Sequence, residues 1–270
     1  MEKDASISDC YRSGKILWGD DFTREQILEW FADEQQAFGD ISEQFGLDNV
    51  YYCRELNRRH LFQYLPPGPF DHCLAIGCGA GQELDPIAGR VNHITAIEPV
   101  QRLWRKAING VPATYIFPDP FGNLPLPDTS VDVVTAFAVL HHIPNVSHVL
   151  SEVARVLKPR GVLLAREPIS SMGDWRLVRP GMTKRERGIP TNVFYSMLVS
   201  HFQVIKATKC CFAPLARLGA ALKVETYNSR KLVSIDRALS VLFDWNDVYW
   251  RDSLLRKCAP GVLAVVSAKP

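Results

Sequence analysis

Residues 75–83, AIGCGAGQE, bring three glycines together directly after the apolar run HCLAIG (72–77). They are Gly77, Gly79 and Gly81. Glycine is used where the backbone adopts a left-handed conformation or must approach a ligand closely. In an α/β protein a glycine-rich turn after a strand lies where ligands bind. This turn is therefore the first candidate for a binding site.

The spacing of the turn separates two kinds of nucleotide site. The nicotinamide-dinucleotide fingerprint Gly-x-Gly-x-x-Gly needs its third glycine at position 82, where this chain has Gln82. Glu98 ends the next apolar run, HITAIE (93–98), and lies 21 residues after Gly77. A carboxylate accepts two hydrogen bonds side by side, which matches the two hydroxyls of a ribose. The turn and Glu98 together predict a site that binds a nucleoside and lacks the backbone contacts that hold a pyrophosphate group.

Short apolar runs alternate with helical patterns on both sides of this turn. Strands are expected at 72–77, 93–98, 113–118, 131–139, 161–167, 202–212 and 261–268. Helices are expected after the capping-box pair Thr23 and Gln26, and at 49–64, 103–108, 145–159 and 191–200. This alternation predicts an α/β fold with a parallel, doubly wound sheet of seven strands.

The composition excludes several classes of protein. With 270 residues, 47% of them hydrophobic and 22% charged, the chain is typical of a globular domain with a full core. A formal net charge of +2 gives no reason to expect a nucleic acid as partner. No apolar run approaches the roughly 18 residues that a membrane span needs. The start, MEKDAS, lacks the apolar segment of a signal peptide, so we expect a cytoplasmic protein.

Cysteine and histidine spacing predicts no metal site. The seven cysteines show no Cys-x-x-Cys pair, so we expect buried free thiols. His141 and His142 are the only close pair of histidines. Adjacent residues on a strand point to opposite faces, and no cysteine or carboxylate pattern surrounds this pair in the sequence.

Four motifs follow one another along the chain: CLAIGCGAG (73–81), Glu98, LPLPDTSVDVVTAFAVLHHIPN (124–145) and LSEVARVLKPRGVLLAREP (150–168). In this order they resemble the class I S-adenosylmethionine-dependent methyltransferases, in the subgroup related to the ubiquinone and menaquinone methyltransferases. The resemblance covers about residues 72–212. With the strand pattern, it divides the chain into an N-terminal helical lid (1–65), a Rossmann-like core (66–213), a helical cap insertion (214–259) and a final core strand (260–270).

The resemblance implies S-adenosylmethionine as the cofactor and S-adenosylhomocysteine as its product. It assigns cofactor-binding roles to Gly77, Cys78, Gly79, Gly81, Glu98, Pro99, Asp119 and Phe137. Glu98 would hold the ribose hydroxyls, and Asp119 would accept from the adenine amino group. Tyr51 and Tyr52 fall where related enzymes place a lid over the cofactor; an ordinary helix packed on the sheet is the alternative.

One position departs from the family's pattern. An acid usually stands two residues before the first glycine and helps to position the methionine amino group, but this chain has Ala75 there. Glu83, just after the turn, could take over this role. Alternatively, backbone carbonyls and the lid hold the amino group, or cofactor binding has been weakened or lost.

The paired histidines are candidates for acid–base chemistry. Methyl transfer from a sulfonium is a displacement that mainly needs alignment of donor and acceptor. A base is needed only where the acceptor carries a proton that must leave, as a hydroxyl does. We expect His142, and secondly His141, to fill that role, because an imidazole titrates near neutral pH. The alternative is that both histidines pack against or cap the next helix.

A basic loop over 170–190 follows the fifth expected strand. Its five cations, Arg176, Arg179, Lys184, Arg185 and Arg187, stand against Asp174 and Glu186, a local charge of 5 − 2 = +3. We expect Arg176, Arg179 and Arg187 to bind an anionic acceptor and Trp175 to form an apolar wall. A solvated basic loop is the alternative. The aromatic-rich segment 214–259 is expected to shape an acceptor pocket or a homodimer face.

These observations predict a methyltransferase that acts on a small molecule, with oxygen as the acceptor atom and an anionic or sugar-type acceptor. Nitrogen and carbon acceptors stay open. A degenerate binding protein without turnover is the alternative from another class, and Ala75 is the feature in its favour. Gln82 disfavours a nicotinamide oxidoreductase. A nucleic-acid methyltransferase would need a wider basic surface and an acceptor motif such as NPPY or DPPY, which the sequence lacks.

Overall fold

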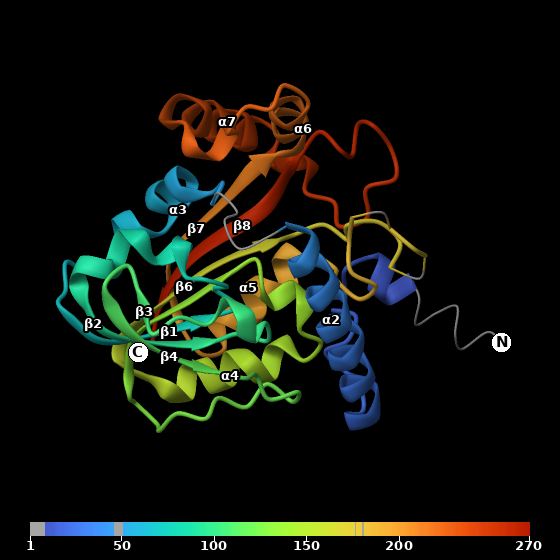
Figure 1. Cartoon of the computed structure of the whole chain (residues 1–270). Coiled ribbons are helices and arrows are strands. Elements are labelled where there is room, and N and C mark those ends of the chain that lie inside the picture. Colours follow the sequence, from blue (N-terminus) through green and yellow to red (C-terminus); the bar gives the residue numbers. More distant parts are fainter. Residues whose placement is uncertain (1–8, 46–50, 176, 180) are drawn as a thin grey trace.

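The computed structural model describes residues 9–45, 51–175, 177–179 and 181–270, and these form an eight-stranded sheet with helices on both faces (Figure 1). The strand order is β3-β4-β2-β1-β5-β6-β8-β7. The strands are β1 (Phe70–Ile76), β2 (Val91–Ile97), β3 (Ala107–Ile108), β4 (Val111–Ile116), β5 (Val131–Phe137), β6 (Leu157–Pro168), β7 (Gln203–Phe212) and β8 (Pro260–Ala268). The expected α/β class is confirmed, with one strand more than predicted.

The sheet is parallel in its centre and antiparallel toward both edges. β4, β2, β1, β5 and β6 pair in parallel, while β8 runs antiparallel between β6 and β7. The described helices are α2 (Arg24–Phe45), α3 (Arg54–His60), α4 (Val146–Val156), α5 (Thr191–Val199), α6 (Ala213–Ala221) and α7 (Arg230–Leu242). Short 3₁₀ turns, η1 (Phe62–Tyr64), η2 (Gln82–Arg90), η3 (Gln101–Leu103), η4 (Leu140–His142), η5 (Thr226–Asn228) and η6 (Asp244–Asn246), connect them.

The capping box at the start of α2 forms as the sequence predicts. The Thr23 backbone N–H donates to Gln26 Oε1 at 2.9 Å, and the Gln26 N–H donates to Thr23 Oγ1 at 3.4 Å. The two side chains thereby satisfy backbone donors that a helix start leaves without partners. None of the described helices is both long and apolar enough to cross a membrane.

The helix expected at 103–108 is wrong. The segment ends as the short strand β3, which pairs antiparallel with β4. Asn109 and Gly110 have φ angles of 50° and 84°, so both occupy the left-handed region. An Asn-Gly pair favours a tight hairpin turn between strands, and this local signal outweighs the weak helical pattern before it.

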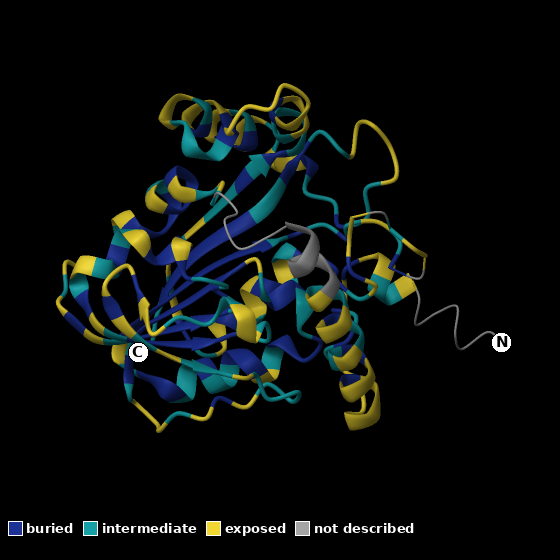
Figure 2. Cartoon of the chain, viewed as in Figure 1, coloured by how far each residue is buried: buried dark blue, intermediate teal, exposed yellow. Residues whose placement is uncertain are grey.

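The strands bury two hydrophobic layers, one on each face of the sheet (Figure 2). Leu74 and Ile76 of β1 belong to the layer covered by α4 and α5, and Cys73 and Ala75 to the layer on the side of α3. Successive strand residues point to opposite faces, so a strand covered on both sides reads as a continuous apolar run.

The order of the strands reverses at β1, whose neighbours are β2 on one side and β5 on the other. In such sheets the crevice beyond the carboxyl ends of the strands receives the ligand. The glycine turn after β1, Glu98 after β2 and η4 after β5 all lie at this edge. The amino-terminal helix α2 runs past the same edge (Figure 1).

Candidate functional site

The glycine turn after β1 requires glycine at two positions, because the backbone is left-handed there and no space is left for a Cβ atom. Gly77 has a φ of +67°, and a Cβ atom there would lie 2.3 Å from Cγ2 of Val139. Gly81 has a φ of +83°, and a Cβ there would lie 2.5 Å from Cγ2 of Ile108. The turn is therefore pressed against the loop after β5 on one side and against β3 on the other.

Glu98 is bound directly to this turn. Its Oε2 accepts from the backbone N–H of Gly79 at 2.8 Å, and its Oε1 accepts from the N–H of Val100 at 2.9 Å. Burial raises the pKa of this carboxyl group, and the two backbone hydrogen bonds oppose that rise. Each oxygen of a carboxylate has a second lone pair, so Glu98 retains acceptor capacity for a ligand's hydroxyl groups.

A cavity extends from the glycine turn to the underside of α2. Its floor includes Gly77, Pro99 and Asp119, which were expected at the cofactor, and its roof includes Trp30 and Phe31 of α2. The empty space in this cavity is about 780 Å³ when the solvent at its open mouth is counted. Most of its lining is apolar.

Asp119 lies at the polar end of this cavity. Its Oδ1 accepts from the Phe121 N–H at 2.8 Å and from the Asn123 side-chain amide at 3.1 Å. These bonds fix the carboxylate in the loop after β4. Glu98 follows β2 and Asp119 follows β4, two adjacent parallel strands, so both lie at the carboxyl edge of the sheet.

A second group of polar side chains lies beneath α3, at the ends of β1 and β6. Burial raises the pKa of Glu83 to about 8, although the Arg166 guanidinium opposes that rise. Glu83 Oε1 and Arg166 Nε are both buried without a hydrogen-bond partner among the described residues. Tyr51 is half-buried, and its hydroxyl accepts from Asn57 Nδ2 at 2.5 Å. Buried polar atoms without partners indicate a place for a polar ligand.

Three other predicted cofactor residues differ in their surroundings. Tyr52 has 57% of its surface exposed and so lies outside the group that contains Tyr51. Phe137 is buried against Phe62, with ring centroids 5.7 Å apart, and faces the α3 side. Cys78 is buried, and its thiol is directed at the carbonyl of Gly79.

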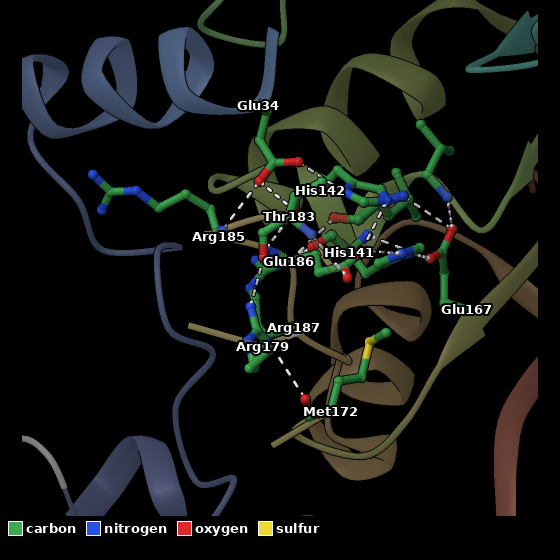
Figure 3. Close-up of polar contacts among 12 residues, drawn as sticks. Glu34, His141, His142, Glu167, Met172, Arg179, Thr183, Arg185, Glu186 and Arg187 are labelled. Carbon is green, nitrogen blue, oxygen red and sulfur yellow. Dashed lines mark hydrogen bonds and ion pairs between the residues drawn. The ribbon is translucent and has the colours of Figure 1, made fainter. Parts of the chain in front are cut away.

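The paired histidines lie on the turn η4 and not on a strand, so their side chains do not point apart (Figure 3). Their ring centroids are 4.0 Å apart. His141 Nδ1 lies 2.9 Å from Glu167 Oε2, and His142 Nδ1 lies 2.8 Å from Glu34 Oε2. Burial lowers the pKa of His141 to about 3 and also lowers the pKa of His142, so both imidazoles are neutral at neutral pH.

Only His142 of this pair lines the cavity. Both histidines direct their Nε2 atoms at Glu186, at 3.8 Å from His141 and 3.5 Å from His142. Each ring therefore has a carboxylate at both nitrogens. A base for an acceptor's proton needs a nitrogen that reaches the acceptor, and in this arrangement neither nitrogen of His142 is directed at the cavity.

Arg187, expected at the acceptor, has a different set of contacts. Its side chain is fully buried and donates to the carbonyl oxygens of Trp18, Leu140, His141, Ile143 and Pro144 at 2.8–3.3 Å. A guanidinium has five N–H donors, and five carbonyls receive them. Arg187 thus fixes the η4 turn to the N-terminal segment and leaves no donor for an acceptor.

The other described cations of loop 170–190 also bind the chain itself. Arg179 donates to the carbonyls of Met172, Thr183 and Lys184. Lys184 and Arg185 form ion pairs with Asp33 of α2, and Arg185 also pairs with Glu29. Trp175 is buried and stacks on Trp18, with ring centroids 5.2 Å apart. Arg176 lies outside the described residues.

The sequence analysis did not predict three residues of this region: Glu34, Arg166 and Glu186. For Arg166 a signal was present, because the charged pair Arg166–Glu167 ends an otherwise apolar strand at the ligand edge. Glu34 and Glu186 are acids of an amphipathic helix and a basic loop. Their histidine partners are more than 40 residues away in the chain, so local pattern could not identify them.

Comparisons of this chain with known proteins find similarity to methyltransferases. Residues 74–165 match a family model described as "Methyltransferase domain". A probable S-adenosylmethionine-dependent methyltransferase of Mycobacterium tuberculosis is 32% identical over 114 residues, which are 41% of this chain and 42% of the relative. The 27-O-demethylrifamycin SV methyltransferase of Amycolatopsis mediterranei is 30% identical over 53% of this chain and 57% of its own.

The fold is also that of solved structures. A crystal structure of an S-adenosylmethionine-dependent methyltransferase from Mesorhizobium loti superposes with a TM-score of 0.53 at 16% identity, over 83% of this chain and 100% of that one. The present chain spans less than half the length of several of the curated relatives that it matches.

Proposed function

Because residues 74–165 are a methyltransferase domain of the S-adenosylmethionine-dependent class, we propose that this protein transfers a methyl group from S-adenosylmethionine to a small molecule. The observation that carries the proposal is the carboxylate of Glu98, bound at 2.8 Å to the glycine turn at the point where the strand order reverses. The cofactor supplies an already activated methyl group, so the protein's main task is to align donor and acceptor.

The residues at the sheet edge fit the parts of this cofactor. We assign the ribose hydroxyls to Glu98 and the adenine amino group to Asp119, because both carboxylates follow adjacent strands at the carboxyl edge of the sheet. The amino-acid part of the cofactor carries an ammonium and a carboxylate. Arg166 provides the positive charge for the carboxylate, and the carboxyl group of Glu83, whose pKa burial raises to about 8, ionises when the ammonium lies beside it. Both have buried polar atoms without partners among the described residues. This pairing supports the assignment of the methionine amino group to Glu83 and removes the main reason, Ala75, to prefer a degenerate protein without turnover.

For the acceptor we propose an apolar molecule with a hydroxyl group, methylated on oxygen. The cavity under α2 has a mainly apolar lining that includes Trp30, Phe31 and Phe38. The described cations of loop 170–190 bind carbonyls and carboxylates of the chain, so they give the anionic acceptor predicted from sequence no support. A relative that acts on 27-O-demethylrifamycin SV is a further reason to consider oxygen.

The acceptor proposal is tested by methyl transfer to a panel of small molecules. We expect turnover with neutral hydroxylated aromatics and less with sugar phosphates or carboxylic acids of similar size. Trp30→Ala should then raise the KM for the acceptor while leaving cofactor affinity unchanged. Faster transfer to the anionic compounds would instead favour the acceptor class first predicted from the basic loop.

Glu83→Gln is expected to weaken binding of S-adenosylhomocysteine by about ten- to a hundredfold, because a hydrogen bond to a charged group contributes about 1.5–3 kcal/mol. The matched ligand is 5′-methylthioadenosine, which keeps the nucleoside and lacks the amino acid. Its affinity should be unchanged in Glu83→Gln and reduced in Glu98→Gln. Calorimetric titration of both ligands checks the assignment; an equal loss for both ligands in Glu83→Gln would remove Glu83 from the methionine end.

A further inference from the structure

Three side-chain atoms that carry lone pairs point toward one another beside the cavity (Figure 3). Nε2 of His142 and Nε2 of His141 lie 3.5 and 3.8 Å from the same Oε2 of Glu186. One ligand atom from each of the three residues lies within 4.8 Å of the others. His141 and Glu186 are buried, and His142 is nearly so.

The hydrogen bonds on the far side of each ring determine which nitrogen carries the hydrogen. The carboxylate of Glu167 accepts from the backbone N–H groups of Val139 and Leu140 and from His141 Nδ1. Glu34 accepts in the same way from the Thr183 hydroxyl at 2.7 Å and from His142 Nδ1. An ionised carboxylate can only accept, so with Glu167 and Glu34 ionised both Nδ1 atoms are the donors in these contacts. In a neutral imidazole the Nε2 atom then has the lone pair.

Glu186 is held so that one oxygen stays directed at the histidines. Thr183 and Glu186 form a reciprocal pair: the Thr183 N–H donates to Glu186 Oε1 at 3.2 Å, and the Glu186 N–H donates to Thr183 Oγ1 at 3.1 Å. The remaining oxygen, Oε2, faces the two Nε2 atoms. Three acceptor atoms thus converge, an arrangement that repels itself electrostatically unless a cation or a shared proton lies between them.

We propose that His141 Nε2, His142 Nε2 and Glu186 Oε2 bind one divalent transition-metal ion of the zinc type. Two imidazoles and one carboxylate are ligands that zinc and its neighbours accept. In such sites each ligating imidazole donates its other nitrogen to a carboxylate, as Glu167 and Glu34 provide here. Two ligands of a tetrahedral zinc ion lie about 3.4 Å apart; the two Nε2–Oε2 distances, 3.5 and 3.8 Å, are close to that value, and all three ligand atoms lie within 4.8 Å of one another.

The surrounding charges allow a divalent cation. Three carboxylates, those of Glu34, Glu167 and Glu186, stand around the two rings. Arg179 and Arg187 direct their donors at backbone carbonyls, and Arg185 forms ion pairs with Glu29 and Asp33. The ion would join η4 to loop 170–190, with Glu34 of α2 behind His142, whereas the sequence alone predicts no metal site. That expectation assumed that the histidines lie on a strand.

The proposed ion has no assigned part in methyl transfer. The ring of His142 lines the cavity, but both of its nitrogens are directed at carboxylates, Nδ1 at Glu34 and Nε2 at Glu186. The metal site is defined by its three ligand atoms and does not depend on the proposed function.

The test is a titration of the full-length protein, stripped with a chelator, with Zn²⁺ alone and with Co²⁺ alone. We expect about one ion per chain, with a Co²⁺ absorption band of a four- or five-coordinate site. Glu186→Gln should weaken Zn²⁺ binding at least about a hundredfold, and Glu34→Gln about ten- to a hundredfold, the range for a carboxylate behind a ligating histidine. S-adenosylhomocysteine affinity should stay unchanged in both variants, which separates this result from the proposed function.

His93→Ala is the matched control, because His72 and His93 form another pair of neighbouring rings, 5.4 Å apart, without a carboxylate between them. It should bind Zn²⁺ as the unmodified protein does. Circular dichroism before titration identifies any variant that fails to fold. If Glu186→Gln fails to fold, the Zn²⁺ affinity of Glu34→Gln, which keeps all three ligands, tests the proposal. The proposal is overturned if the unmodified protein binds no ion at this stoichiometry, or if Glu186→Gln and Glu34→Gln bind Zn²⁺ as tightly as it does.

Discussion

Gly77→Ala is expected to abolish cofactor binding within the measurable range, a loss of more than about a hundredfold, and to destabilise the fold. The added Cβ would lie 2.3 Å from Cγ2 and 2.8 Å from Cβ of Val139. Val139 is β-branched and its Cβ belongs to the main-chain frame, so it cannot rotate away. The left-handed φ of +67° costs an alanine a further 1–2 kcal/mol, roughly. With overpacking of about 1–3 kcal/mol, the free energy of unfolding should fall by about 2–5 kcal/mol.

Gly79→Ala is the matched control for this prediction. Gly79 has a similar φ of +56°, but the nearest atom to an added Cβ is Cδ1 of Leu103 at 3.7 Å, an ordinary contact. Only the conformational cost of about 1–2 kcal/mol should remain. Urea unfolding and S-adenosylhomocysteine titration of the two variants distinguish the steric cost of the added Cβ from the cost of the left-handed backbone conformation. Equal effects in both variants would show that the contact with Val139 does not matter.

The second large effect is expected for Arg187→Met. Methionine approximates the length of the arginine side chain but removes every donor that holds the η4 turn. Five carbonyl oxygens would lose a charged partner in the interior. Leaving buried acceptors without partners is costly, so the free energy of unfolding should fall by about 3–5 kcal/mol.

Arg179→Met provides the comparison, because Arg179 lies in the same loop but is only half buried and donates to three carbonyls. Its loss should be about 1 kcal/mol. Denaturant unfolding of both variants measures the difference. If Arg187→Met is as stable as the unmodified protein and only raises the KM for an acceptor, the guanidinium binds the acceptor, as the sequence alone predicts.

The parts of the fold that the sequence predicts are those governed by local pattern. The apolar runs before Gly77 and Glu98 are buried on both faces, so they are strands in the structure as they are in the sequence. The glycine spacing at 77, 79 and 81 requires the positive φ angles that the structure shows. The capping box at Thr23 fixes the start of α2 for the same local reason.

The parts that the sequence does not predict depend on contacts between distant segments. The partners of Glu34 are His142 and Thr183, 108 and 149 residues away. Arg187 appears as one of five cations in a basic loop, and only the fold reveals that it is buried under η4. The sequence predicts a strand over 131–139, whereas β5 ends at Phe137 and the chain turns at Ala138, whose φ is 56°, so that the histidine pair lies on η4.

The central claim is that the glycine turn and Glu98 hold S-adenosylmethionine, and one calorimetric experiment tests it most directly. S-adenosylhomocysteine is titrated into the unmodified protein and into Glu98→Gln, with NADH as the control ligand. The account predicts binding of S-adenosylhomocysteine, none of NADH, and a loss of about 1–3 kcal/mol in the variant, a factor of about five to 150. Absence of binding to the folded protein, or equal affinity in Glu98→Gln, would contradict it.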